Sequence, residues 1–223
     1  MSAPSAKQPS DSTRVPDPIR VPDPTRMIEP FVTPAAWAEA QLPHLDTLLL
    51  EQAHLEKKAA SFAVGFLFRL PLHGPLHRQL SKLGREELMH FERTLKLLDQ
   101  RGVAFLPLVA SDYASELKKA GRRDLKGRLA DELLIASIIE HRSHERMSLM
   151  AAATRTTEAE VSSFYAELCP SEERHEQLYL DLATLVVDAE TVRTRHAELV
   201  EHERRVLSEL PFSHRLHSGL PVT

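Results

Sequence analysis

The chain has 223 residues, of which 42% are hydrophobic and 27% charged, a balance that suits one sizeable soluble domain with short appendages. Its formal net charge of −4 excludes a general attraction to nucleic acid, so an RNA partner would need a local basic patch. The single cysteine, Cys169, excludes an intramolecular disulfide framework; with no long apolar run and no signal-type N-terminus, we expect a cytoplasmic protein without a membrane segment.

Residues 1–30 differ in composition from the rest of the chain. The pentapeptide Arg-Val-Pro-Asp-Pro begins at Arg14 and again at Arg20. Proline lacks a backbone N–H donor and blocks helix formation. We therefore expect residues 1–30 to be a disordered, proline-rich leader, residues 31–188 to form the main domain, and residues 189–223 to form a peripheral helix and C-terminal tail.

The remaining sequence has the three- and four-residue hydrophobic spacing of amphipathic helices, and no stretch alternates with period two. Gly102 is placed to end the second long helix, and Thr157 to cap the start of the fourth. Pro170 should kink that fourth helix, because proline removes one backbone hydrogen bond. We expect long helices over residues 43–69, 76–101, 129–153, 158–188 and 190–210 and a short one over 112–120, and hence an all-α domain.

Two of these expected helices carry a Glu-x-x-His motif. One runs from Glu87 to His90 and the other from Glu172 to His175. Residues three apart lie on one side of a helix, so each motif presents a carboxylate and an imidazole to the same point. One such motif is weak evidence in a chain rich in glutamate and histidine.

Glu56 and Glu140 strengthen the pattern, because each lies on the helix before one of the motifs and at nearly the same interval from it. Four helices that each offer one inward carboxylate, two of them with a histidine, are typical of ferritin-like bundles that bind two metal ions. Two divalent cations would also balance four buried carboxylates, and this ligand set favours iron or manganese. The expected ligands are Glu56, Glu87, His90, Glu140, Glu172 and His175, in a ferritin-like four-helix bundle with an additional C-terminal helix.

Several nearby residues are alternatives to these ligands. Glu51 should face away from Glu56, whereas Glu145 could replace Glu140, and Glu86 could pair with His90. His144 lies one turn beyond Glu140 and is a candidate for the layer just outside the ligands. We expect two further histidines, on the charged last helix, to be solvated: His196 and His202.

Four stretches that carry these residues resemble the MiaE family of tRNA hydroxylases: 54–61, 85–92, 139–146 and 171–175. The resemblance spans about residues 31 to 186 and omits the leader and the last helix. It implies two iron ions at the six positions and O₂-dependent hydroxylation of the isopentenyl chain of 2-methylthio-N6-isopentenyladenosine in tRNA. Such chemistry needs a redox metal, since side chains alone cannot activate O₂. The expected partners are tRNA and an electron-donor protein, for a monomer or small oligomer.

Two groups of basic residues are candidates for contact with RNA phosphates. The first, our main RNA-binding candidate, consists of Lys118, Lys119, Arg122, Arg123, Lys126 and Arg128. The second consists of Arg69, His73, His77, Arg78, Lys82 and Arg85. The alternatives to a tRNA hydroxylase are a ferritin-like di-metal oxidase that acts on another substrate and an iron-storage or peroxide-detoxifying protein.

Overall fold

The computed structural model describes residues 31–70 and 75–221, and within these ranges the chain forms helices and no strand. The all-α expectation is confirmed. The proline-rich leader and the break at 71–74, which includes His73, lie outside the described residues. In chain order the elements are α1 (Ala35–Gln41), the 3-10 helix η1 (Leu42–His44), α2 (Leu45–Leu67), α3 (Pro75–Gln100), α4 (Tyr113–Lys118), α5 (Leu125–Thr154), α6 (Ala159–Val186) and α7 (Ala189–Glu209).

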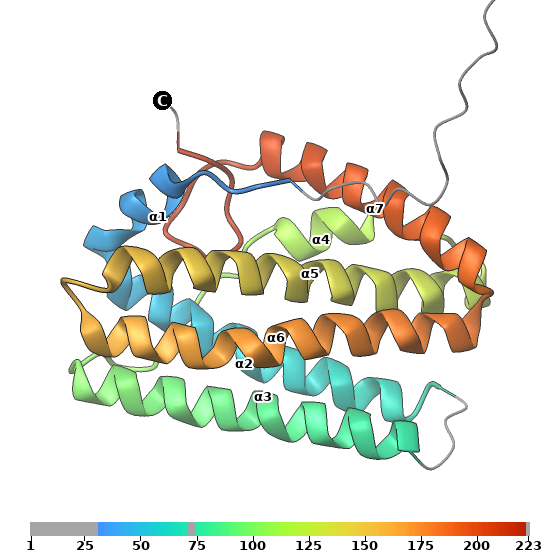
Figure 1. Cartoon of the computed structure of the whole chain (residues 1–223), viewed down its shortest axis with the longest axis horizontal. Coiled ribbons are helices and arrows are strands. Elements are labelled where there is room, and N and C mark those ends of the chain that lie inside the picture. Colours follow the sequence, from blue (N-terminus) through green and yellow to red (C-terminus); the bar gives the residue numbers. More distant parts are fainter. Residues whose placement is uncertain (1–30, 71–74, 222–223) are drawn as a thin grey trace, which may run out of the picture.

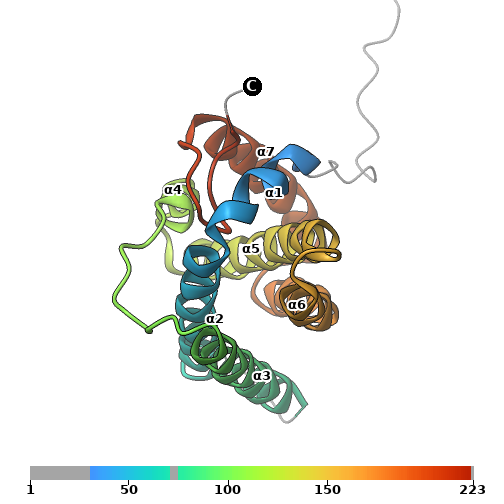
Figure 2. The same ribbon diagram turned by 90° about the vertical axis from the view of Figure 1, so that its left-hand side faces the viewer.

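Four long helices form the bundle. Helix α2 packs along α3, and α5 packs along α6, so the bundle is built from two helical hairpins (Figure 1). The connection between the hairpins passes from the end of α3 around α2 to α4 before α5 begins (Figure 2). One long crossover of this kind is a known variant of four-helix bundle topology.

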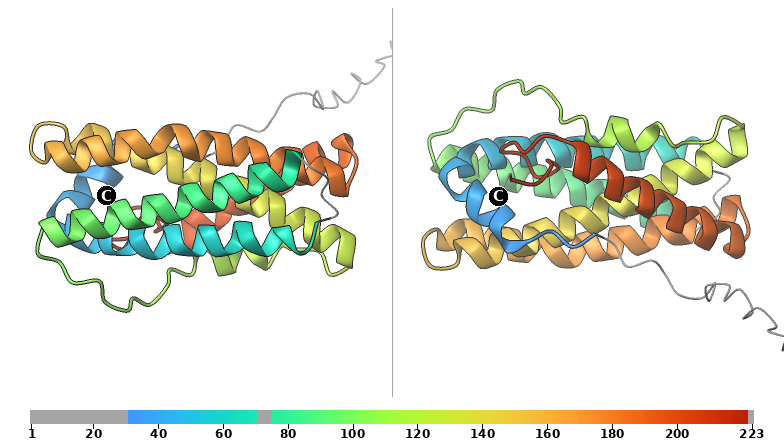
Figure 3. Two further views of the ribbon diagram at one scale, coloured as in Figure 1. Left: turned by 90° about the horizontal axis from the view of Figure 1, so that it is seen from below. Right: turned by 90° about the horizontal axis from the view of Figure 1, so that it is seen from above.

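The other helices cover one side of the bundle. Helices α1, α4 and α7 lie over α2 and α5, whereas no other described helix covers α3 and α6 on the opposite side (Figure 3). Among the described residues no helix combines the length and apolar character that crossing a membrane requires.

Local signals explain most helix ends. Asp124 caps α5 by accepting a hydrogen bond from the Gly127 backbone N–H (2.7 Å), and Asp188 caps α7 in the same way. Gly102 has a φ of 69°, so the expected end of α3 is confirmed. The expected cap of α6 at Thr157 is wrong, because the N-cap is Glu158 and it makes no side-chain capping bond. Helix α6 continues through Pro170.

Buried apolar side chains form two clusters, one toward each end of the bundle. Leu48, Leu98 and Met147 belong to one cluster, and Phe66, Leu83 and Leu134 belong to the other. On each bundle helix the expected metal ligands fall between the residues of the two clusters. A polar layer therefore crosses the middle of the bundle, and the apolar packing on both sides fixes the helices that carry it.

The last helix is less exposed than the sequence indicated. Val192, Leu199 and Leu207 are buried where α7 packs on α4 and α5. The expectation that His196 and His202 are solvated is wrong. His196 is buried, and the half-buried His202 has its Nε2 atom 3.0 Å from the Glu116 carbonyl oxygen.

The segment after α7 folds back into the molecule rather than forming an exposed tail. Leu216, His217 and Ser218 are buried. Arg146 on α5 donates to the carbonyl oxygens of Leu216 (2.5 Å) and Ser218 (2.8 Å), and Trp37 donates to the Ser218 hydroxyl (3.2 Å). Because these donors are buried, the contacts fix the segment against α1 and α5.

The His217 side chain stacks on the Tyr113 ring, with 4.8 Å between ring centroids. Burial, together with the charges of Arg146 and Arg142, lowers the pKa of His217 from 6.5 to about 3. The folded protein therefore holds this imidazole neutral over most of the acidic range, whereas the unfolded chain protonates it below about pH 6.5.

We predict that replacing His217 with Gln reduces the loss of stability on acidification. Stability due to neutral His217 is complete above pH 6.5 and falls as the pH drops toward 3, by about 1.4 kcal/mol per pH unit. Denaturant unfolding of metal-free wild type and variant at about pH 7 and about pH 5 measures this. Wild type should lose about 2 kcal/mol more than the variant; equal losses would contradict the prediction.

Candidate metal centre

The six expected ligands converge in the polar layer of the bundle. Glu56 comes from α2, Glu87 and His90 from α3, Glu140 from α5, and Glu172 and His175 from α6. All six side chains are buried, with at most 6% exposure. Burial of four carboxylates at one place is costly unless opposite charge accompanies them.

The six residues form two overlapping groups in which the potential ligand atoms lie within 4.8 Å of one another. Glu87 and Glu172 belong to both groups. Glu56 and His90 complete one group, and Glu140 and His175 complete the other. Two terminal pairs with two shared carboxylates are the arrangement that a pair of bridged metal ions requires.

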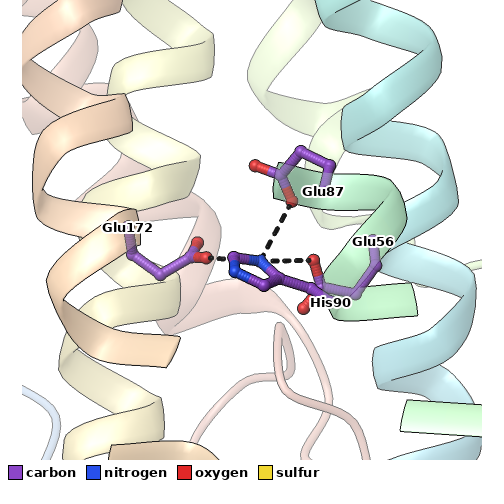
Figure 4. A group of neighbouring side chains, drawn as sticks. All are labelled: Glu56, Glu87, His90 and Glu172. Atoms are coloured by element: carbon purple, nitrogen blue, oxygen red, sulfur yellow. Dashed lines mark ion pairs between the residues drawn. The ribbon is translucent and has the colours of Figure 1, made fainter. Parts of the chain in front are cut away.

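Figure 4 shows the first group around the His90 imidazole. Its Nδ1 atom lies 3.6 Å from Glu56, 3.7 Å from Glu87 and 3.9 Å from Glu172. In the second group, His175 Nδ1 lies 2.7 Å from Glu87 Oε1. Both imidazoles therefore direct Nδ1 toward the shared carboxylates.

Several of these inward atoms have no hydrogen-bond partner. They are Nδ1 of both His90 and His175, and Oε1 of both Glu87 and Glu172. The short His175–Glu87 contact does not have the alignment of a hydrogen bond, which is why both atoms remain unpaired. Buried, unpaired nitrogen and oxygen atoms that face one another are what a metal site presents, so the residues fit divalent cations.

The pKa values reflect the accumulated negative charge. Burial, with the charge of Glu87, raises the pKa of Glu56 to about 8 and of Glu140 to about 7, and burial with Glu140 raises that of Glu172. Burial alone would raise the pKa of Glu87 too, but the two imidazoles lower it to about 2. The cluster therefore retains protons near neutral pH, and cations that bind there must displace them.

Further polar residues contact the six expected ligands from outside the two groups. His90 Nε2 lies 3.2 Å from the Ser171 hydroxyl, and His175 Nε2 lies 3.1 Å from Glu86 Oε2. Gln52 donates to Glu56 Oε1 at 2.5 Å. No sequence pattern distinguishes Gln52 or Ser171 from other residues of their kind, and the motif spacing suggested Glu86 only as a partner of His90.

The alternative ligands lie outside both groups. As expected, Glu51 faces elsewhere: it accepts a hydrogen bond from the Leu216 backbone N–H at 2.5 Å. Glu145 instead accepts hydrogen bonds from the Thr33 backbone N–H (2.6 Å) and hydroxyl (2.7 Å). His144 is half-buried and joins neither group, so the structure does not bring its ring to the ligands.

Half of the six RNA-binding candidates are paired with acids. Lys119 pairs with Glu116 (2.6 Å), Arg122 with Asp131 (2.8 Å), and Arg128 with Glu132 (3.8 Å). The Lys118 ammonium instead lies over the Phe62 ring, 5.7 Å from its centroid. Four of the six line an open hollow of about 450 Å³ at one end of the bundle: Lys118, Arg122, Arg123 and Arg128.

In the second basic group, Arg69 pairs with Glu132 at 2.5 Å, and Lys82 lies 3.5 Å from Glu86. Arg85 donates to the Ser81 hydroxyl at 3.0 Å. The two basic groups meet at Arg69, which also lines the hollow.

Comparison with known proteins places these features in a family. Residues 23–218 match the family model described as tRNA-(MS[2]IO[6]A)-hydroxylase (MiaE). This match extends beyond the range expected from the sequence and includes the last helix and the buried C-terminal segment.

Two curated relatives carry the name tRNA 2-(methylsulfanyl)-N(6)-isopentenyladenosine(37) hydroxylase. The relative from Pseudomonas putida is 39% identical over 85% of this chain and 91% of its own length. The relative from Salmonella typhimurium is 33% identical over 62% of this chain and 50% of its own length.

A solved structure from Synechococcus, described as protein 43 with aldehyde deformylating oxygenase activity, is 35% identical to this chain. It superposes with a TM-score of 0.79, over 89% of this chain and 99% of its own length. The expected ferritin-like four-helix bundle with an additional C-terminal helix is confirmed. From the family match and the 39% identity, the chain belongs to the MiaE family of tRNA hydroxylases.

Proposed function

We propose that this protein hydroxylates the isopentenyl side chain of 2-methylthio-N6-isopentenyladenosine in tRNA, with two iron ions, O₂ and a reductant. The observation that supports this most strongly is the buried cluster of four glutamates and two histidines in a chain that belongs to the MiaE family. Its curated relatives are named for this reaction. We further propose that it works in the cytoplasm, as a monomer or small oligomer.

Glu56 and His90 would hold one iron, and Glu140 and His175 the other. Glu87 and Glu172 would reach both ions, since they belong to both groups. Carboxylate and imidazole ligands suit iron or manganese, and two divalent cations neutralise four carboxylates.

Insertion of one atom of O₂ into a C–H bond releases the other atom as water and consumes two electrons and two protons. The irons would supply the redox chemistry that side chains lack, with electrons from a donor protein. The residues of this chain orient the ligand atoms and exclude bulk water. The apolar clusters on both sides of the polar layer are the residues that exclude water.

Contact with tRNA is proposed at the basic hollow, where Arg123 has no acidic partner among the described residues and Lys118 meets only an aromatic ring. Cations that are not already paired are the ones available to RNA phosphates. Phe62 and Ile135 in the same hollow supply apolar surface beside them.

A second candidate function is oxidation of a different molecule at the same site. The similarity to the Synechococcus protein with aldehyde deformylating oxygenase activity favours this alternative. An assay that offers both kinds of substrate separates the two.

We predict that iron-loaded protein adds one oxygen atom to the isopentenylated nucleoside of tRNA when O₂ and a chemical reductant are present. Mass spectrometry of digested tRNA measures the product, with protein treated with a chelator as the control. A parallel reaction offers a fatty aldehyde and the free nucleoside. If the protein converts the aldehyde but adds no oxygen atom to the isopentenylated tRNA, the second candidate function would replace the tRNA proposal.

We predict that the shared carboxylates matter more for metal content than the terminal ones. Glu56→Gln or Glu140→Gln should leave about one bound iron per chain, because each belongs to one group. Glu87→Gln or Glu172→Gln should weaken iron binding at both positions and leave less than one bound iron per chain, because each belongs to both groups. Elemental analysis after dialysis measures this.

Glu51→Gln is the matched control for the ligand variants, because Glu51 is a buried glutamate on α2 outside both groups. It should retain wild-type metal content. Equal losses in the control and in Glu172→Gln would show that the ligand assignment is wrong.

We predict that the double variant Lys118→Glu with Arg123→Glu binds tRNA at least about 10-fold more weakly. The slope of log binding constant against log salt concentration should become shallower by about one unit for each phosphate contact that is lost. Filter binding at several salt concentrations tests this. Lys96→Glu, at an exposed lysine on α3 away from the hollow, controls for charge reversal. Unchanged binding in the double variant would remove the hollow from the tRNA site.

A further inference from the structure

The two histidines of the metal centre have different partners on their outer nitrogen atoms. His175 Nε2 faces a carboxylate oxygen of Glu86 at 3.1 Å. His90 Nε2 faces the hydroxyl of Ser171 at 3.2 Å. The two halves of the centre are therefore alike in their ligands but not in the groups behind the ligands.

Both outer partners act as hydrogen-bond acceptors. The Ser171 hydroxyl donates its one hydrogen to the Leu168 carbonyl oxygen at 2.7 Å, so toward His90 it can only accept. Ionised Glu86 also only accepts. With a metal ion bound, each imidazole would therefore carry its proton on Nε2 and direct the Nδ1 lone pair toward the metal position.

Glu86 is held in place as a charged group. Lys82 lies 3.5 Å from it on α3, and Arg174 on α6 donates to it at 3.3 Å. Arg174 is itself anchored, because it donates to the Pro170 carbonyl oxygen at 2.7 Å. These contacts join α3 to α6 and keep the carboxylate behind His175.

The hydrogen-bond partners of the terminal carboxylates, Glu56 and Glu140, also favour stronger metal binding in the group that contains His175. Gln52 donates a hydrogen bond to Glu56, in the group that contains His90. A donor on a carboxylate oxygen withdraws electron density that a metal would otherwise receive. Apart from the other expected ligands, no side chain among the described residues donates a hydrogen bond to Glu140, in the group that contains His175.

We propose that the two metal positions differ in affinity, and that Glu86 makes the position of His175 and Glu140 the tighter one. A carboxylate behind an imidazole raises its basicity and fixes its orientation more strongly than a neutral hydroxyl does. Glu86 is thus a positioning residue that acts through His175. This inference rests on the ligand assignment of the proposed function, but it does not depend on the substrate.

Anaerobic titration of the metal-free full-length protein with Co(II), followed by visible absorption and calorimetry, tests the inference without any activity assay. The wild type should bind in two resolved steps. Glu86→Gln should weaken the first step by about 10- to 100-fold and leave the second within about threefold. Ser171→Ala should weaken the second step and leave the first.

Glu92→Gln is the matched control, since Glu92 is an exposed glutamate on α3 next to the same motif. It should reproduce the wild-type curve. Two wild-type steps of equal affinity would overturn the inference even if the Glu86 variant did not fold. Equal weakening of both steps by Glu86→Gln would overturn it as well.

These outcomes are distinct from failure of the proposed function. Unequal Co(II) binding that depends on Glu86, in a protein that does not hydroxylate tRNA, would contradict the proposed reaction and support this inference. Hydroxylation of tRNA by a protein with two equivalent metal positions would support the proposed reaction and contradict this inference.

Discussion

The structure depends on the burial of four carboxylates and two imidazoles between two helical hairpins. Such a layer is unfavourable by itself, because each buried charge loses its hydration and the carboxylates repel one another. Apolar clusters toward both ends of the bundle hold the helices that carry the layer. Bound cations would turn this repulsion into attraction, and the free energy of metal binding would then contribute to the stability of the fold.

The rest of the fold is arranged around this layer unevenly. Helices α1, α4 and α7 and the C-terminal segment cover α2 and α5, whereas α3 and α6 have no such cover among the described residues. The buried contacts of Arg146 with the C-terminal segment belong to the covered side. The link from Arg174 through Glu86 to His175 belongs to the opposite side. The covered side thus serves stability, and the α3–α6 side holds the residues that orient a ligand.

The sequence alone was sufficient to predict the bundle and the six clustered residues, because both follow from helical periodicity and from pairs of residues three apart. It could not predict features that depend on tertiary contacts. Ser171 is one serine among many until α6 packs beside α3 and places it behind His90. The charged composition of α7 concealed the burial of His196, and only the fold pairs Arg122 with Asp131 on α5.

The most direct test of the central claim is a crystal structure of iron-loaded protein with an anomalous difference map recorded at the iron absorption edge. The account predicts two peaks about 3.5–4 Å apart, one beside Glu56 and His90 and the other beside Glu140 and His175, with Glu87 and Glu172 in contact with both. Iron bound elsewhere on the chain, or an iron-loaded crystal in which this layer contains no peak, would contradict it.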